Sequence, residues 1–400
     1  MNIAMMVRGF ILVPRPPDMI YAPIDLAYAL AKGLSERGHK IDFYAPLGSS
    51  VEGANIRTCN LRPLATNQEE FQNLISNPAL MTHYIPAMWD SYMADEMFVR
   101  ANAGKYDLLH FHHPESALPH ARINGDVPVI YTLHDPTYDW FKELYDLYQT
   151  SNQHFISISN NQRRDAPDLP YAATVYNGID PDDYPFSEEA EDYLLFSGRI
   201  IPEKGVKEAV QIAKKLKHRL LIIGSITPDN QTYFDQHIKP HLDDQILYLG
   251  YIERDQLSKY YKKAKALLTP VQWEEPFGLA TIEAMASGTP VISLKKGAAS
   301  ELIINGKTGY VVESIAEMIE SVQKISDIKR KACRKHATEN FSIEKMVDGY
   351  ETTFEQVLRD RKKLSRQFVR TKITKVPQKL RGSTQKRHHK KMNKIAKKAQ

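Results

Sequence analysis

The chain has 400 residues, of which 42% are hydrophobic and 25% are charged, as in an ordinary globular protein with room for two or three domains. Its net charge of +5 conceals an acidic body and a basic end, because residues 361–400 contain sixteen Lys or Arg and no Asp or Glu, which leaves the rest at −11. The two cysteines are too few for a disulfide framework or a cysteine-based zinc site. No apolar run approaches the roughly 18 residues that cross a bilayer, which excludes a membrane-spanning protein. We therefore expect a cytoplasmic protein that could attach at the inner face of a membrane.

The first half alternates short apolar segments with helical patterns. Residues Ile24 to Leu34 carry an apolar stripe of helical spacing that Gly38 is placed to end, and residues 66–104 look mostly helical. Strands separated by helices favour a parallel sheet, so we expect a Rossmann-like domain over residues 1–180. Its expected strands are Asn2–Val7, Ile41–Tyr44, Leu108–Phe111, Val129–Thr132 and Phe155–Ser159.

Turn residues at 177–181 and an acidic run at 188–192 indicate a linker, after which the pattern starts again. We expect a second Rossmann-like domain over 181–345, a helix over 346–370 that packs back toward the first domain, and a disordered basic tail over 371–400. Asp255 and Ser342 are expected helix caps. The expected elements of this half are strands at Tyr193–Ser197, Leu220–Ile223, Ile246–Leu249, Ala266–Thr269 and Val291–Ser293, and helices at Val206–Leu216, Asp255–Ala264 and from Ser342 to about Arg370.

Two such doubly wound sheets would face each other across a cleft at their strand carboxyl ends, which is where ligands bind. Near one of these ends, Glu275 and Glu283 flank a Pro-Phe-Gly turn that runs into a helix. The N–H groups of a helix N-terminus suit phosphate, and carboxylates suit hydroxyl-rich groups. Phosphate beside a polyol indicates a nucleotide sugar.

A second loop reads Gly198-Arg199-Ile200-Ile201-Pro202-Glu203-Lys204-Gly205 and also follows a strand. The forked donors of Arg199 and the point charge of Lys204 both suit phosphate oxygens. The alternative is that both side chains are simply solvated in an exposed loop. For His134 the alternative is a satisfied histidine at a strand end.

With these motifs the chain resembles a retaining glycosyltransferase of the GT-B fold, family 4, over roughly residues 1–360. The strongest part is the Glu-x7-Glu motif from Glu275 to Glu283, which continues as far as Val291. The other matching segments, in chain order, are Arg37-Gly38-His39, Thr132-Leu133-His134-Asp135, Asn177-Gly178-Ile179-Asp180 and the 198–205 loop.

The resemblance implies that Arg199 and Lys204 bind the donor diphosphate, that Glu275 holds sugar hydroxyls and that Glu283 holds the ribose. It also places the backbone N–H groups of Phe277, Gly278 and Leu279 at the distal phosphate or sugar, and His134 beside the reacting centre. Glu275 is expected to bind and stabilise rather than to act as a nucleophile.

We expect no metal and no cofactor, because Arg, Lys and a helix dipole can stabilise a leaving diphosphate. The Asp180-Pro181-Asp182 segment is interpreted as linker chemistry, and the 110–113 histidines as an unsuitable metal site. The loop 13–23 lacks the glycine pair that many family members carry. It is either an altered rigid loop or an unusual acceptor site with Arg15 or Tyr21 contacting the acceptor.

Two other functions remain open at this point. A GT-B-like sugar-nucleotide epimerase shares the fold, and a non-enzymatic protein could bind polyanions or membranes through residues 371–400. A tail of one charge suits anionic lipids, and no aromatic residue follows Phe368 to stack on bases, so we expect no specific nucleic-acid partner.

Overall fold

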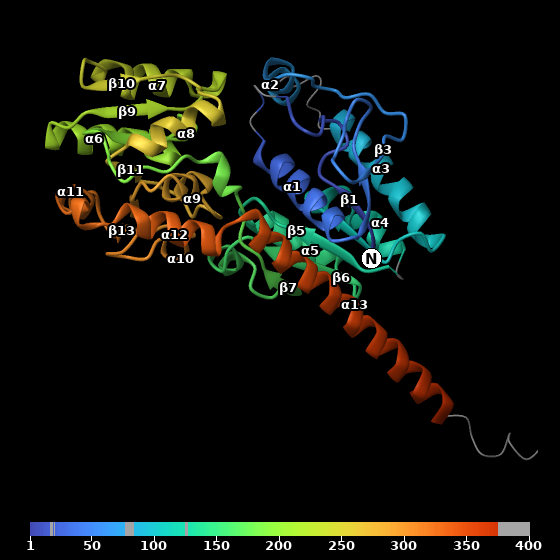
Figure 1. Ribbon diagram of the computed structural model, residues 1–400. Helices are drawn as coiled ribbons and strands as arrows, with labels where there is room; N and C mark the ends of the chain where they lie inside the picture. The colour runs from blue at the N-terminus through green and yellow to red at the C-terminus, as the bar shows by residue number, and fades with distance from the viewer. Residues whose placement is uncertain (17–18, 20, 77–83, 125–126, 375–400) are drawn as a thin grey trace, which may run out of the picture. The chain divides into compact units, whose positions relative to one another are not determined.

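The computed structural model describes residues 1–16, 19, 21–76, 84–124 and 127–374 (Figure 1). The chain forms two compact units that divide within the last helix, Met1–Thr353 and Phe354–Gln400. The first unit contains a seven-stranded and a six-stranded sheet, counted over the described residues, and every strand pairing in both is parallel. The predicted class of two doubly wound α/β sheets is confirmed.

The seven-stranded sheet and its helices form what we call the N-terminal lobe. Its strand order is β3-β2-β1-β4-β5-β6-β7. The strands are β1 (Asn2–Met6), β2 (Lys40–Tyr44), β3 (Asn55–Arg57), β4 (Leu108–Phe111), β5 (Val129–Thr132), β6 (Gln153–Ser157) and β7 (Tyr171–Thr174). The sequence patterns missed the two outer strands of this lobe, β3 and β7.

The helices of this lobe are α1 (Ala22–Glu36), α2 (Gln68–Ser76), α3 (Tyr84–Asn102), α4 (Leu118–Ile123) and α5 (Asp139–Tyr148). The apolar stripe of α1 is buried as predicted. Helices α2 and α3 confirm the helical character expected for 66–104 in the part that is described, since residues 77–83 lie outside it.

The six-stranded sheet and its helices form the C-terminal lobe, with strand order β10-β9-β8-β11-β12-β13. Its strands are β8 (Leu194–Ser197), β9 (Leu220–Ile223), β10 (Ile246–Tyr248), β11 (Ala266–Thr269), β12 (Val291–Leu294) and β13 (Gly309–Val312). Its helices are α6 (Val206–Leu216), α7 (Gln231–His237), α8 (Arg254–Lys263), α9 (Leu279–Ala286), α10 (Ala299–Leu302), α11 (Ile315–Gln323) and α12 (Arg330–Asn340). The cap prediction for α8 was wrong: Glu253 is the capping residue and Asp255 lies inside the first turn.

The last helix, α13 (Ile343–Thr374), begins where predicted, because the Ser342 hydroxyl accepts a hydrogen bond from the Lys345 N–H at 3.2 Å. Its first turns contact the N-terminal lobe, where Val347 lies against Gly33 and Glu351 binds Arg37 at 2.6 Å. The helix continues four residues beyond its predicted end, so residues 371–374 are helical. The rest of the predicted tail, residues 375–400, lies outside the described residues. Among the described helices, none combines the length and the hydropathy needed to cross a bilayer.

Candidate active site

A cleft of about 540 Å³ opens at the carboxyl ends of strands from both sheets, where the doubly wound topology predicts a ligand. It is lined by every residue that the sequence singled out as a donor-binding or catalytic candidate. These are His134, Arg199, Lys204, Glu275, Phe277, Gly278, Leu279 and Glu283. Tyr21 also lines the cleft, whereas Arg15 does not.

Lys204 and Glu275 form an ion pair across two loops of the C-terminal lobe. Lys204 precedes Gly205, whose backbone adopts a φ of +75° and passes so close to the Pro270 carbonyl that a Cβ atom would lie 1.8 Å from its oxygen. Only glycine permits this approach, which brings the 198–205 loop against the loop after β11. The Lys204 ammonium also lies 5.8 Å from the centre of the Trp273 ring, a cation–π contact that the motif analysis missed.

Helix α9 begins in the cleft with Gly278 as its capping residue. Gly278 has a φ of +106°, which favours glycine, and this turns the chain so that the helix starts at Leu279. Phe277 is buried with its ring 6.1 Å from that of Tyr176 and 6.3 Å from that of Phe341. Its side chain belongs to the core, so the backbone is what Phe277 can offer to a ligand.

Glu283 projects from α9 and is only 8% exposed. The hydroxyl of Tyr184 donates to its Oε1 at 3.0 Å, and the hydroxyl of Tyr261 donates to its Oε2 at 3.1 Å. Each carboxylate oxygen can accept two hydrogen bonds and accepts one from a tyrosine, so Glu283 keeps acceptor capacity for a ligand while its orientation is fixed. No sequence pattern indicates either tyrosine, since they lie 99 and 22 residues from Glu283 along the chain.

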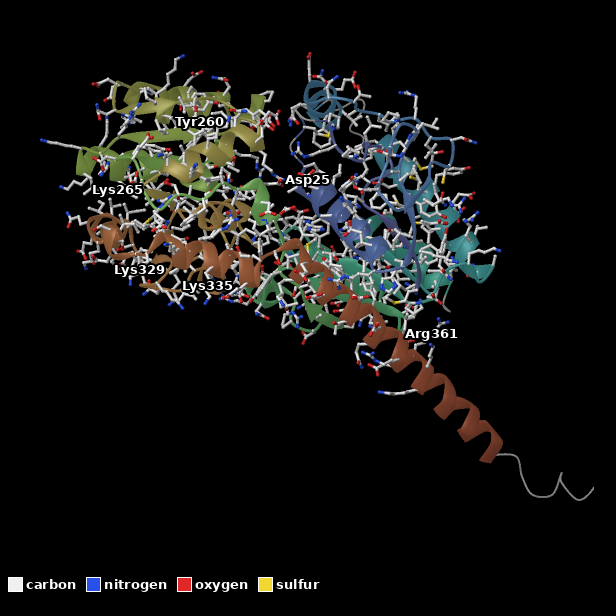
Figure 2. All side chains as sticks on the ribbon, in the orientation of Figure 1. Asp25, Tyr260, Lys265, Lys329, Lys335 and Arg361 are labelled. Atoms are coloured by element: carbon white, nitrogen blue, oxygen red, sulfur yellow. The ribbon has the colours of Figure 1, made fainter. Side chains whose placement is uncertain are left out.

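Arg254, at the start of α8, connects this carboxylate with the N-terminal lobe. Its Nη2 lies 4.0 Å from Glu283 Oε1 and 3.3 Å from Asp25 Oδ2. Asp25 lies on α1 at the side of the N-terminal lobe that faces the other sheet (Figure 2). Arg15, the predicted acceptor-binding residue, binds Asp25 at 2.9 Å and the Met19 carbonyl, so its guanidinium holds the 13–23 loop to α1.

A second set of contacts joins the lobes on another side of the cleft. The Glu301 carboxylate accepts hydrogen bonds from the backbone N–H groups of Asn160 and Asn161, each at 2.7 Å, and from the Tyr176 hydroxyl at 2.9 Å. Glu301 belongs to α10 and the two asparagines follow β6. This cluster fixes the loop after β6 near the cleft.

The N-terminal wall of the cleft carries a histidine cluster. His134, after β5, is half-buried, and its Nε2 lies 2.9 Å from Nδ1 of the buried His112. His110 packs against His112 with ring centres 4.4 Å apart, and its Nε2 lies 2.9 Å from the Thr132 hydroxyl. Burial lowers the pKa of His134 to about 4 and that of His110 to about 3, so both rings are neutral at neutral pH.

Within the described residues, no three or more His, Cys, Asp or Glu side chains are grouped so that they could hold a metal ion. In particular, the histidines of the 110–113 segment bond to His134 and Thr132 or lie beside Glu115.

Two family models match adjacent parts of the chain. "Glycosyltransferase Family 4" matches residues 26–183 and "Glycosyl transferases group 1" matches residues 183–340. Together they cover residues 26–340, which contain strands β2 to β13 and include His134, Arg199, Lys204, Glu275 and Glu283.

Curated relatives show the same likeness over most of their length. N-acetyl-alpha-D-glucosaminyl L-malate synthase of Bacillus anthracis is 27% identical over 83% of this chain and 93% of the relative. An uncharacterised glycosyltransferase of Methanocaldococcus jannaschii is 24% identical over 86% of this chain and 97% of the relative.

Solved structures share the fold. Anabaena HepE in complex with UDP and glucose has a TM-score of 0.63 at 15% identity, covering 89% of this chain and all of that one. The catalytic domain of Arabidopsis thaliana starch synthase IV, bound to ADP and acarbose, has a TM-score of 0.66 at 14% identity, covering 90% and 99%. With both family models aligned to the two lobes and the motif residues gathered in one cleft, the chain belongs to the GT-B glycosyltransferases of family 4.

Proposed function

We propose that this glycosyltransferase takes its sugar from a nucleoside-diphosphate sugar and transfers it, with retention of configuration, to a hydroxyl-bearing lipid, glycan or small molecule. The observation that carries the proposal is that Arg199, Lys204 and the N-terminus of α9 share one cleft with Glu275 and Glu283. Cationic groups and a helix N-terminus suit the diphosphate, while the two carboxylates suit hydroxyls. The UDP, glucose and ADP named for the two structural neighbours support the same class of donor.

In this proposal the ribose hydroxyls donate to Glu283 and the sugar hydroxyls to Glu275. The backbone N–H groups of Phe277, Gly278 and Leu279 face the distal phosphate or the sugar. Arg199 and Lys204 bind the diphosphate oxygens, and His134 faces the transferred sugar from the opposite wall. Tyr21 lines the acceptor side, and Arg15 shapes that side by holding the 13–23 loop to Asp25.

The reaction breaks the bond between sugar C1 and the phosphate oxygen and forms a bond between C1 and the acceptor oxygen. The acceptor proton passes to the leaving diphosphate, so that atoms and charges balance. Fixed positive groups at the leaving oxygens stabilise the developing negative charge more than water does, and Lys204, Arg199 and the α9 dipole supply them without any cofactor in this proposal. In this proposal Glu275 binds the sugar hydroxyls and stabilises the transition state, and it does not act as a nucleophile.

A donor panel tests the proposal. UDP-glucose, UDP-N-acetylglucosamine, GDP-mannose and ADP-glucose are compared by thermal shift, and we expect one of them to raise Tm by several degrees, since saturation at 100 Kd adds about 2.7 kcal/mol. The Lys204→Ala variant should lose that shift, while Lys215→Ala, on the exposed face of α6, should keep it. No shift with any donor, or an unchanged shift in Lys204→Ala, contradicts the proposal.

Product analysis without acceptor separates transfer from the epimerase alternative. A transferase leaves the donor intact or releases free sugar and nucleotide by slow hydrolysis. An epimerised sugar nucleotide in this assay would show the other reaction.

A further inference from the structure

His112 and His134 are joined by a hydrogen bond that lies in the plane of both rings. They follow the neighbouring parallel strands β4 and β5, whose register pairs Phe111 with Tyr131. Nδ1 of His112 lies 2.9 Å from Nε2 of His134, the ring planes differ by 14° and the ring centres are 5.2 Å apart. That separation corresponds to rings that meet edge to edge, so the contact is directional and can carry one proton.

Both rings are neutral, so this hydrogen bond contains a single N–H group. Burial lowers the pKa of His112 well below its usual value, as it lowers that of His134. A neutral imidazole has one donor and one acceptor nitrogen, and therefore two arrangements are available. Either His112 donates from Nδ1 to His134, or His134 donates from Nε2 to His112.

The surroundings of His112 distinguish the two arrangements. His112 is 4% exposed, and among the described residues its Nε2 has no hydrogen-bond partner. If His134 donated, His112 would bury an unpaired N–H group, which native structures rarely do. If His112 donates, its Nε2 is unprotonated and only a lone pair is left without a partner, and under-satisfied acceptors are less rare in native structures than unpaired N–H groups.

We propose that His112 is a positioning residue that donates its Nδ1–H to His134 Nε2 and thereby fixes His134 as the tautomer protonated at Nδ1. His134 then offers a neutral N–H donor, and it has no free basic nitrogen with which to remove a proton from the acceptor. This inference rests on the proposed function for its consequence, which is that His134 donates a hydrogen bond to an oxygen of the transferred sugar. The tautomer itself is a property of the free protein.

Histidine tautomers can be read directly by long-range ¹H–¹⁵N correlation spectra of protein labelled in its imidazole nitrogens. The His134 signals are assigned by their loss in His134→Asn. We expect Nδ1 of His134 to be protonated and Nε2 to be bare at pH 7 without any ligand. The opposite pattern, with the proton on Nε2, overturns the proposal.

Two variants of His112 provide the matched comparison. In His112→Asn the side-chain amide places an N–H donor near the position of Nδ1, so His134 should keep its tautomer and most of the donor turnover. In His112→Leu no donor is left, and we expect a mixed tautomer and a kcat at least tenfold lower with KM little changed. An unchanged His134 tautomer in His112→Leu contradicts the positioning role.

The spectra need neither donor nor acceptor, so they stand if the proposed function fails. If the leucine variant does not fold, the wild-type and asparagine spectra still decide the tautomer.

Discussion

Lys204 and Glu275 are partners of each other: the ammonium group that the motif assigns to the diphosphate is bound to the carboxylate that the motif assigns to the sugar. Both side chains are largely buried, at 19% and 16% exposed, which strengthens their attraction relative to a surface pair. A diphosphate that binds Lys204 competes with Glu275 for it. The exchange would leave Glu275 with free acceptor capacity beside the sugar, so we expect phosphate binding and sugar recognition to be coupled through this pair.

This coupling predicts opposite effects of two substitutions on the binding of UDP or whichever nucleotide the donor panel identifies. Lys204→Ala removes a charge-assisted contact, about 1.5–3 kcal/mol, and should weaken nucleotide affinity roughly 10- to 100-fold. Glu275→Gln removes the competing carboxylate, so nucleotide affinity should be equal or tighter while turnover of the sugar nucleotide falls at least about 100-fold, as for loss of a transition-state contact. Isothermal titration calorimetry and a donor-turnover assay measure the two quantities.

Lys215→Ala is the control for the loss of one positive charge elsewhere in the lobe. If Glu275→Gln weakens nucleotide binding as much as Lys204→Ala does, the pair supports the site as a unit and the competition does not exist.

The two tyrosines on Glu283 give a second prediction. Tyr261→Phe or Tyr184→Phe removes one buried hydrogen bond to a carboxylate, which costs about 1–3 kcal/mol of stability and loosens Glu283. We expect the donor KM to rise about tenfold, because the ribose hydroxyls meet a less ordered acceptor. Tyr260→Phe, one position away on the same helix and labelled in Figure 2, is the matched control and should keep the wild-type KM.

Equal KM values in Tyr261→Phe and Tyr260→Phe would show that Glu283 does not depend on its tyrosine partners. Nucleoside diphosphate should be compared with the bare pyrophosphate as ligand, since only the former has ribose hydroxyls to report on Glu283.

Short-range patterns were sufficient for the inner strands and for the donor motifs. A buried parallel strand such as β9 is an unbroken apolar run. The Glu275–Glu283 spacing lies within one turn and one helix. Both features can therefore be recognised in a single short stretch of sequence. The outer strands β3 and β7 of the N-terminal lobe were missed because they are only partly buried and carry no such run. The outer strand β13 of the C-terminal lobe was missed as well, since it begins at a glycine and its other residues are only partly buried. The predicted cap of α8, Asp255, lies two residues after the observed cap, Glu253. Glu253, Arg254 and Asp255 are all polar, and the helix begins at Arg254, one residue before Asp255, the first residue of a type that commonly caps helices.

The partners of the motif residues could not be found in this way. Asp25 meets Arg254 across 229 positions, and Tyr184 meets Glu283 across 99, so only the fold brings them together. His112 was visible in the sequence, but as one of three histidines whose only evident use was a metal site. Its bond to His134 depends on the parallel register of β4 and β5, which the sequence does not specify.

The basic C-terminal segment supports a third prediction, which concerns location rather than catalysis. Each Lys or Arg near an anionic surface contributes about 1 kcal/mol, so deletion of residues 375–400 should reduce binding to phosphatidylserine-containing vesicles at least tenfold. Donor turnover in solution should be unchanged. Pure phosphatidylcholine vesicles are the control, and equal binding of the full and shortened chains to anionic vesicles contradicts the hypothesis.

The buried His110 makes the fold sensitive to acid. Its pKa is lowered from 6.5 to about 3 by burial, so below pH 6.5 the unfolded chain binds a proton that the folded chain does not. The stabilisation is therefore complete above pH 6.5 and is lost as the pH falls toward 3, by about 2 kcal/mol at pH 5 at 1.36 kcal/mol per pKa unit. In His110→Asn the fall in unfolding free energy between pH 7 and pH 5, measured by urea denaturation, should be smaller than in the wild type by about that amount.

Thr132→Val removes the hydroxyl beside His110 but keeps the histidine buried, so its pH dependence should match the wild type even though its stability is lower at both pH values. A His110→Asn variant with an undiminished fall would mean that other groups account for the acid sensitivity.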